Sequence, residues 1–187
     1  MDWTTMTTTI TRAADLPRIP WRNGQGLTTE LAMSGPSDDF AWRVNLADVT
    51  QSGAFSLFPG VDRTIVLVEG EGMALHLPDG VHPLERDAPF AFDGGLVVSC
   101  TVERPTQDLN LMTRRGTTTG TIEVLDLDGT TDVVPGTGSV VVVVLDGSCS
   151  VGGERLGTGD VAVVTGADAT RLDGAGRVAL VRIAQAG

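Results

Sequence analysis

Short runs of valine and threonine, cut repeatedly by glycine or proline, dominate this sequence. The chain places 24 glycines and 9 prolines among 187 residues, so few stretches stay uninterrupted long enough for a helix. No stretch keeps the extended i, i+3, i+4, i+7 apolar pattern of an amphipathic helix. β-Branched residues in short runs bounded by turn residues are typical of all-β sandwiches and barrels. We therefore predict an all-β fold with a sizeable core.

The two halves of the chain repeat one order of elements but differ in polarity. Each half favours the order strand, glycine-rich hairpin, strand, turn and strand, and Thr117–Gly120 is the expected linker. The first half carries polar residues at alternate strand positions, whereas the strands of the second half are mostly apolar. We predict an N-terminal barrel with the pocket over residues 1–118. A C-terminal scaffold barrel is predicted over residues 119–187, with strands that the two barrels can share.

The charge of the chain argues against several classes of partner and mechanism. With 13 basic and 24 acidic residues the net charge is −11 and the pI is near 4.4. Nucleic acids and anionic membranes need a basic surface, so neither is an expected partner. All 13 cations are arginines, and the chain has no lysine and no tyrosine. This excludes a Schiff-base lysine, a P-loop lysine and a catalytic tyrosine.

The cellular setting predicted from the sequence is the cytoplasm. Residues 1–14 are rich in threonine and show no apolar secretory segment, and the longest apolar run, Val140–Leu145, is too short to cross a bilayer. Cys100 and Cys149 have no metal or redox spacing. We expect both to be free structural thiols.

Metal and cofactor chemistry are not expected. The histidines are His76 and His82 alone, whereas an iron or zinc site in a small β-barrel needs two or three histidines and a carboxylate on neighbouring strands. Adding Glu71 or Glu85 does not complete such a set. We therefore predict no metal site and no cofactor.

A twelve-residue stretch, Pro20–Leu31, combines an aromatic ring, a cation, a turn signal and an acid. Asn23-Gly24 predicts a tight turn because both residues tolerate positive φ, and Gly26 permits close approach of another backbone or a ligand. In an extended strand Thr28 and Glu30 share one face. This pattern suits a strand lining a cavity, and an ordinary hairpin with a solvated face would produce it as well.

Polar residues at alternate positions recur on two further predicted strands, and a fourth strand contributes Arg63. Arginine is suited to bidentate capture of a carboxylate, so a pocket for a small acid or zwitterion is one interpretation. An internal salt-bridge network at the barrel mouth fits the pattern equally well. The residues on these faces are Asn23, Thr28, Glu30, Arg43, Asn45, Arg63, Asp108, Asn110 and Arg114.

Four motifs, in one order over about residues 20–116, resemble the signatures of the HutD/Ves family. They are Pro20-Trp21-Arg22-Asn23-Gly24-x-Gly26-x-Thr28-x-Glu30, Trp42-Arg43-x-Asn45-x-Ala47-x-Val49, Gly53-x-Phe55-Ser56-x-Phe58-Pro59-Gly60-x-Asp62-Arg63 and Asp108-x-Asn110-x-Met112-x-Arg114-Arg115-Gly116. With these motifs Trp21 and Ser56 join the candidate ligand-binding residues. Gln25 and Asn45 depart from the family pattern, where a third glycine and a serine are common.

The resemblance implies a bicupin, that is, two fused cupin-like β-barrels, in a cytoplasmic protein without the usual cupin metal ligands. It also implies an association with histidine utilisation, with a role in sensing or limiting pathway intermediates. Formiminoglutamate, formylglutamate and urocanate are the implied candidate ligands. No established reaction comes with the family, and the stress-related Ves branch is an equally available assignment.

Three hypotheses follow for function. In the first, the protein binds a small carboxylate or amino-acid-like metabolite without a metal: Arg43 and Arg63 hold the carboxylate, Asn23 and Thr28 hold neutral polar atoms, and Glu30 meets an amine or imine. In the second, it is an enzyme that uses Glu30 or Asp108 as a general base. In the third, the polar residues on the strand faces are structural, and the protein acts through a protein partner or as a homodimer. The first is favoured, so a non-enzymatic role is the main expectation.

Overall fold

The computed structural model describes residues 6–21, 24 and 26–187 and confirms the all-β prediction. In that part of the chain every element is a strand except η1, a single 3₁₀ turn at Ala13–Asp15. No helix in the same residues is long and apolar enough to span a bilayer. The chain divides into two compact units, which we call the N-terminal unit, Pro17–Thr117, and the C-terminal unit.

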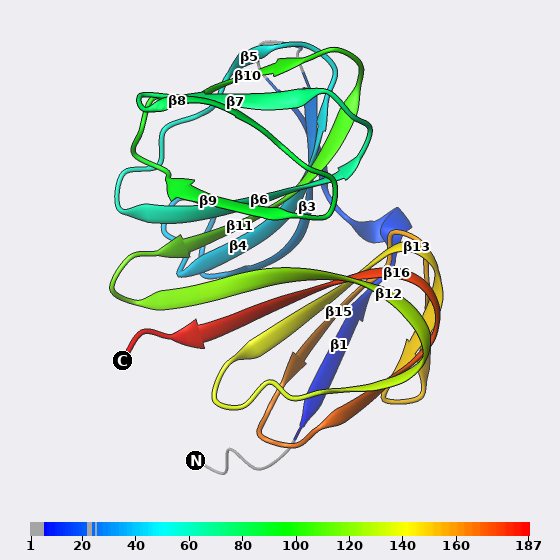
Figure 1. Ribbon diagram of the computed structural model, residues 1–187. Coiled ribbons are helices and arrows are strands. Elements are labelled where there is room, and N and C mark those ends of the chain that lie inside the picture. Colours follow the sequence, from blue (N-terminus) through cyan, green and yellow to red (C-terminus); the bar gives the residue numbers. More distant parts are fainter. Residues whose placement is uncertain (1–5, 22–23, 25) are drawn as a thin grey trace. The chain divides into compact units, whose positions relative to one another are not determined.

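Two antiparallel sheets form the N-terminal unit and face each other as layers in Figure 1. The larger has the order β2-β3-β4-β11-β6-β9, formed by Arg18–Pro20, Gly26–Ser34, Trp42–Val49, Thr106–Arg114, Val61–Glu69 and Pro89–Asp93. The smaller has the order β5-β10-β7-β8, formed by Gly53–Ala54, Ser99–Val102, Met73–Leu77 and Gly80–Pro83. All of the pairings between these strands are antiparallel.

The inward face of the larger sheet changes from polar to apolar along its strands. On β4, Arg43 and Asn45 precede Ala47 and Val49, and β6 changes in the same way after Arg63. Because side chains alternate along a strand, these residues share one face. The apolar end joins a buried cluster that includes Ile65, Leu67, Met73, Leu75 and Cys100. The interior is therefore packed at one end and polar at the other.

The C-terminal unit is one six-stranded sheet with an apolar interior. Its strands are β1 (Thr7–Thr11), β12 (Thr118–Val133), β13 (Ser139–Val151), β14 (Glu154–Gly157), β15 (Val161–Thr165) and β16 (Thr170–Gln185). The interior is filled by residues such as Val140, Val142, Leu156, Leu172 and Leu180. Both cysteines, Cys149 here and Cys100 in the other unit, are free and buried, as predicted.

The N-terminal strand departs from the predicted domain boundary. We expected residues 1–118 to form the first barrel, but β1 pairs with β15 along its whole length, from Thr7↔Thr165 to Thr11↔Val161. The segment from β1 to Leu16 therefore belongs with Thr118–Gly187 in the C-terminal unit. The cause is the open edge of β15, whose free backbone groups β1 satisfies.

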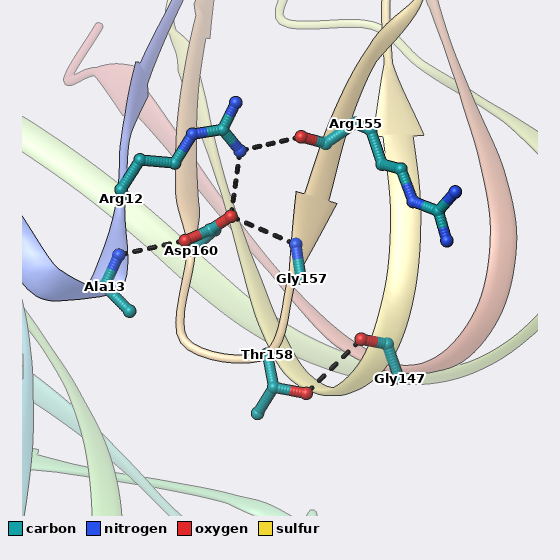
Figure 2. Close-up of polar contacts among 7 residues, drawn as sticks. All are labelled: Arg12, Ala13, Gly147, Arg155, Gly157, Thr158 and Asp160. Atoms are coloured by element: carbon teal, nitrogen blue, oxygen red, sulfur yellow. Dashed lines mark hydrogen bonds and ion pairs between the residues drawn. The ribbon is translucent and has the colours of Figure 1, made fainter.

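A carboxylate secures this N-terminal strand, as Figure 2 shows. Asp160 Oδ1 accepts a hydrogen bond from the Ala13 backbone N–H at 2.9 Å, and its Oδ2 accepts from Gly157 N at 3.0 Å and Arg12 Nη1 at 2.9 Å. Arg12 Nη1 also donates to the Arg155 carbonyl at 2.7 Å. One side chain thus ties the end of β1 to the turn between β14 and β15. We call this group the Asp160 clamp.

Candidate functional site

A cavity of about 630 Å³ lies in the N-terminal unit, at the polar end of its interior. It is lined by side chains from β2, β3, β4, β5, β6 and β11 and from the segments beside them. The lining residues are Ile19, Pro20, Trp21, Thr28, Arg43, Asn45, Ala47, Ala54, Phe55, Ser56, Phe58, Arg63, Asp108, Asn110 and Met112. The wall therefore combines polar side chains from the predicted strand faces with aromatic and aliphatic side chains.

Strand register brings together the polar residues that stand at alternate positions of the predicted strands. Directly paired residues of neighbouring antiparallel strands point to the same face, so each row crosses the sheet. Glu30, Asn45 and Asn110 form one such row. Arg43, Met112 and Arg63 form the next. Residues that are up to 80 positions apart in the chain thus share one face of the sheet.

Arg43, which lines the cavity, forms a largely buried ion pair with Glu30. Glu30 Oε2 accepts a hydrogen bond from Arg43 Nε at 2.7 Å and forms an ion-pair contact of 2.6 Å with Arg43 Nη2. Glu30 Oε1 is also buried and has no hydrogen-bond partner among the described residues. The charge of Arg43 is therefore matched by the protein itself, while Glu30 retains one oxygen for a further donor.

Arg63 has a different environment although it lies in the same row. It is only 6% exposed and donates from Nη2 to the neutral Asn110 Oδ1 at 2.8 Å. Its Cζ atom lies 5.0 Å from the ring centres of Phe55 and Phe92 and 5.8 Å from that of Phe58, within cation–π range. Burial lowers the pKa of Arg63 to about 10, so the side chain stays charged at neutral pH.

Asp108 lies beside this group and is 1% exposed. Its Oδ1 accepts a hydrogen bond from Asn110 Nδ2, and its Oδ2 is a buried atom without a partner among the described residues. Burial raises the pKa of Asp108 to about 7, against the opposing effects of Arg63 and of the bond from Asn110. Asp108 therefore changes its protonation state near neutral pH.

The predicted hairpin forms the rim of the site. β2 pairs with β3 from Arg18↔Thr29 to Pro20↔Leu27, and the Trp21 indole N–H donates to Thr28 Oγ1 at 2.8 Å. A side chain at Gly26 would meet the Asp48 carbonyl at 2.5 Å, which explains the glycine at this close approach. The Thr28 hydroxyl that we assigned to a ligand is thus already bonded to Trp21.

Three of the predicted site residues do not line the cavity. Glu30 is outside the lining although its strand position pairs with the lining residue Asn45. Arg114 does not line the cavity, because its side chain turns to the loop before β4, where it donates to the Phe40 carbonyl at 3.1 Å and to Asp39 at 2.8 Å. Arg114 is the last residue of β11, so it lies beyond the part of the strand that lines the cavity. Asn23 lies outside the residues that the structure describes.

Sequence reasoning missed the aromatic part of the site. Phe55 and Phe58 flank the predicted Ser56, and Phe92 faces Arg63 across β9 and β6. Their signal was present in the motif that carries Ser56, in which Phe55 and Phe58 stand three positions apart. Strand alternation alone gave no reason to place them around a cation, because apolar side chains usually indicate core.

The donor set of the cavity does not suit a transition metal. In the described part of the chain no three side chains among His, Cys, Asp and Glu come together as a metal site would require. The lining contains no histidine, and its one carboxylate, Asp108, lies beside the cation Arg63. Imidazole and thiolate ligands, which iron, zinc or copper favour, are absent from this lining.

Known proteins are similar to this chain in sequence and in architecture. The model of the HutD family matches residues 13–181. The chain belongs to the HutD family. Among its relatives, Protein Ves of Citrobacter koseri is 39% identical to this chain over 152 residues, which cover 76% of each protein. The solved structure of HutD from Pseudomonas fluorescens SBW25 is 32% identical, with a TM-score of 0.85 over 97% of this chain and 100% of that one.

The match confirms the resemblance drawn from the four motifs. At the level of the fold alone, this HutD-family chain is also similar to an oxalate decarboxylase, with 8% identity and a TM-score of 0.68 over 98% of this chain and 79% of that one. The architecture is therefore cupin-like, as the motifs implied.

Proposed function

We propose that this HutD-family protein binds a small carboxylate metabolite of histidine utilisation in the N-terminal cavity and thereby senses or limits that pathway in the cytoplasm. The observation that carries the proposal is Arg63. Its buried guanidinium lines the cavity and is bonded to a neutral amide, with no carboxylate in salt-bridge contact among the described residues. A desolvated cation in that setting favours an incoming anion.

The neighbouring groups support a ligand with both an acid and a nitrogen function. Glu30 Oε1, beside the lining residue Arg43, lacks a partner among the described residues, so it can accept a hydrogen bond from a ligand N–H. A volume of about 630 Å³ suits a small metabolite. Formiminoglutamate, formylglutamate and urocanate each combine a carboxylate with such a nitrogen. Since Arg43 is neutralised by Glu30, we assign the carboxylate to Arg63 alone.

Isothermal titration calorimetry with these three compounds tests the proposal. We expect at least one to bind, and the Arg63→Gln variant to lose about tenfold or more in affinity, as removal of a charge-assisted hydrogen bond of about 1.5–3 kcal/mol predicts. Arg104→Gln is the matched control, because Arg104 is exposed and does not line the cavity. Folded protein that binds none of the three, or an Arg63→Gln variant that binds as well as the wild type, would overturn the proposal.

Asp108 favours a second candidate function, an enzyme acting on the same class of acid. A general base works best when its pKa lies near the operating pH, and the pKa of Asp108 is raised by burial to about 7. Glu30 suits this role less well, because one of its oxygens is held by Arg43. Turnover of a bound panel compound that disappears in Asp108→Asn while binding persists would support the enzyme. No conversion of any panel compound by the wild type would exclude it for these substrates.

A further inference from the structure

The charges of the cavity wall are not all balanced in the same way. Arg43 and Glu30 cancel each other through two short contacts, so they contribute no net charge. This leaves Arg63 and Asp108, which are both buried and both line the cavity. With Asp108 ionised the wall is neutral overall, and with Asp108 protonated it carries one positive charge. A ligand carboxylate therefore suits only one of these two states.

The surroundings of Asp108 allow it to hold a proton. Asn110 Nδ2 donates to Oδ1, which leaves Oδ2 as the oxygen for the proton, and that atom has no partner among the described residues. Asp108 is on β11, which lies between β4 and β6. Arg63 on β6, Asp48 on β4 and Cys100 on β10 interact electrostatically with Asp108. Arg43 on β4 and its partner Glu30 on β3 are charged groups on the same face of the sheet as Arg63.

None of these groups replaces Asp108 as the balancing charge. Glu30 and Arg43 are paired with each other, and Asp48 accepts hydrogen bonds from Arg18 and Gln107. Burial raises the pKa of the Cys100 thiol, so it stays neutral. When an anion is buried next to Arg63, an ionised Asp108 would leave one negative charge uncompensated. A buried uncompensated charge is costly, and proton uptake removes it.

We propose that the cavity takes up its carboxylate ligand together with one proton, which Asp108 Oδ2 holds and donates to the bound carboxylate beside Arg63. The inference rests on the proposed function of this site. The proton comes from the buffered solvent and forms the O–H bond of Asp108, with no other covalent bond changed, so the complex contains the ligand anion, the Arg63 cation and neutral Asp108. A hydrogen bond from a carboxylic acid to a carboxylate is among the stronger ones available.

This mechanism gives an unusual dependence of affinity on pH. Since the pKa of Asp108 is about 7, roughly one protein molecule in ten holds the proton near pH 8 and about nine in ten near pH 6. Affinity is therefore expected to fall about tenfold from pH 6 to pH 8. The same arithmetic predicts uptake of close to one proton for each ligand near pH 8 and close to none near pH 6.

The test is calorimetry with N-formylglutamate, and with acetate as a minimal carboxylate, in buffers of different ionisation enthalpy. Neither probe titrates between about pH 6 and pH 8. We expect the wild type to take up about one proton near pH 8. The Asp108→Asn variant is expected to take up none and to bind about tenfold more tightly than the wild type near pH 8, because its amide mimics the neutral acid at all pH values.

Asp62→Asn is the control, because it removes an exposed carboxylate that does not line the cavity and is expected to leave proton uptake unchanged. Binding of the probes without proton uptake near pH 8 overturns this inference and leaves the proposed function intact. Absence of binding at every pH overturns both. If Asp108→Asn does not fold, proton uptake by the wild type alone decides the question.

Discussion

At the scale of single residues, the two arginines of one row have different roles because their partners differ. Arg43 is bonded to the carboxylate of Glu30, whereas Arg63 is bonded to the amide of Asn110. An arginine whose charge is already matched contributes mainly to the position of the wall. An arginine without a matching charge retains electrostatic attraction for a ligand.

This difference predicts the outcome of a double-mutant cycle on Arg43 and Glu30. Arg43→Met leaves a largely buried carboxylate without its partner and is expected to lower the free energy of unfolding by roughly 3 kcal/mol. Adding Glu30→Gln removes that charge, so the double variant is expected to be more stable than Arg43→Met alone. Urea denaturation measures both. A double variant as destabilised as the sum of its single variants would show that the pair is not coupled.

The double variant also separates a structural from a binding role. If Arg43 only positions the wall, Arg43→Met with Glu30→Gln is expected to keep most of the affinity for N-formylglutamate that Arg63→Gln loses. Comparable losses in both variants would return Arg43 to the role of carboxylate anchor that the strand pattern first suggested.

At the scale of elements, the Asp160 clamp holds β1 to the rest of the C-terminal unit (Figure 2). Asp160→Ala removes acceptors from two backbone N–H groups and from Arg12, so we expect a loss of about 2–3 kcal/mol in the free energy of unfolding. Asp168→Ala, at an exposed aspartate in the turn before β16, is the control. Faster hydrogen exchange in β1 of Asp160→Ala is the local sign, and unchanged exchange there would contradict the role of the clamp.

The elements also show how far the sequence could lead. Period-two alternation is a local property. The residues that it put on polar strand faces include Thr28, Arg43, Asn45, Asp108 and Asn110, which line one cavity. The pairing of β1 with β15 depends on an edge 150 to 158 residues away, which no local pattern encodes. The partners of Arg43, Arg63 and Arg114 likewise depend on which strands become neighbours. Alternation therefore predicted the polar faces but not the ion pairs within them.

At the scale of the whole molecule, two aspartates give stability opposite dependences on pH. The pKa of Asp160 is lowered, because bonds from Gly157, Ala13 and Arg12 outweigh its desolvation. Its contribution is present above the unfolded pKa of about 4 and is lost as the pH falls through its folded value. The pKa of Asp108 is raised to about 7, so its contribution is complete below about pH 4 and is lost as the pH rises towards 7.

The raised pKa of Asp108 predicts that the free energy of unfolding of the wild type, relative to that of Asp108→Asn, decreases as the pH rises. Near pH 5 the native state keeps Asp108 protonated while the unfolded chain ionises it, and near pH 8 the native state must bear a buried charge. The variant never carries that charge, so its free energy of unfolding is expected to rise relative to the wild type between pH 5 and pH 8. Urea denaturation at both pH values measures the difference. A difference that does not change with pH would mean that Asp108 ionises equally easily in the folded and unfolded chain. It would also remove the electrostatic reason for proton uptake with the ligand.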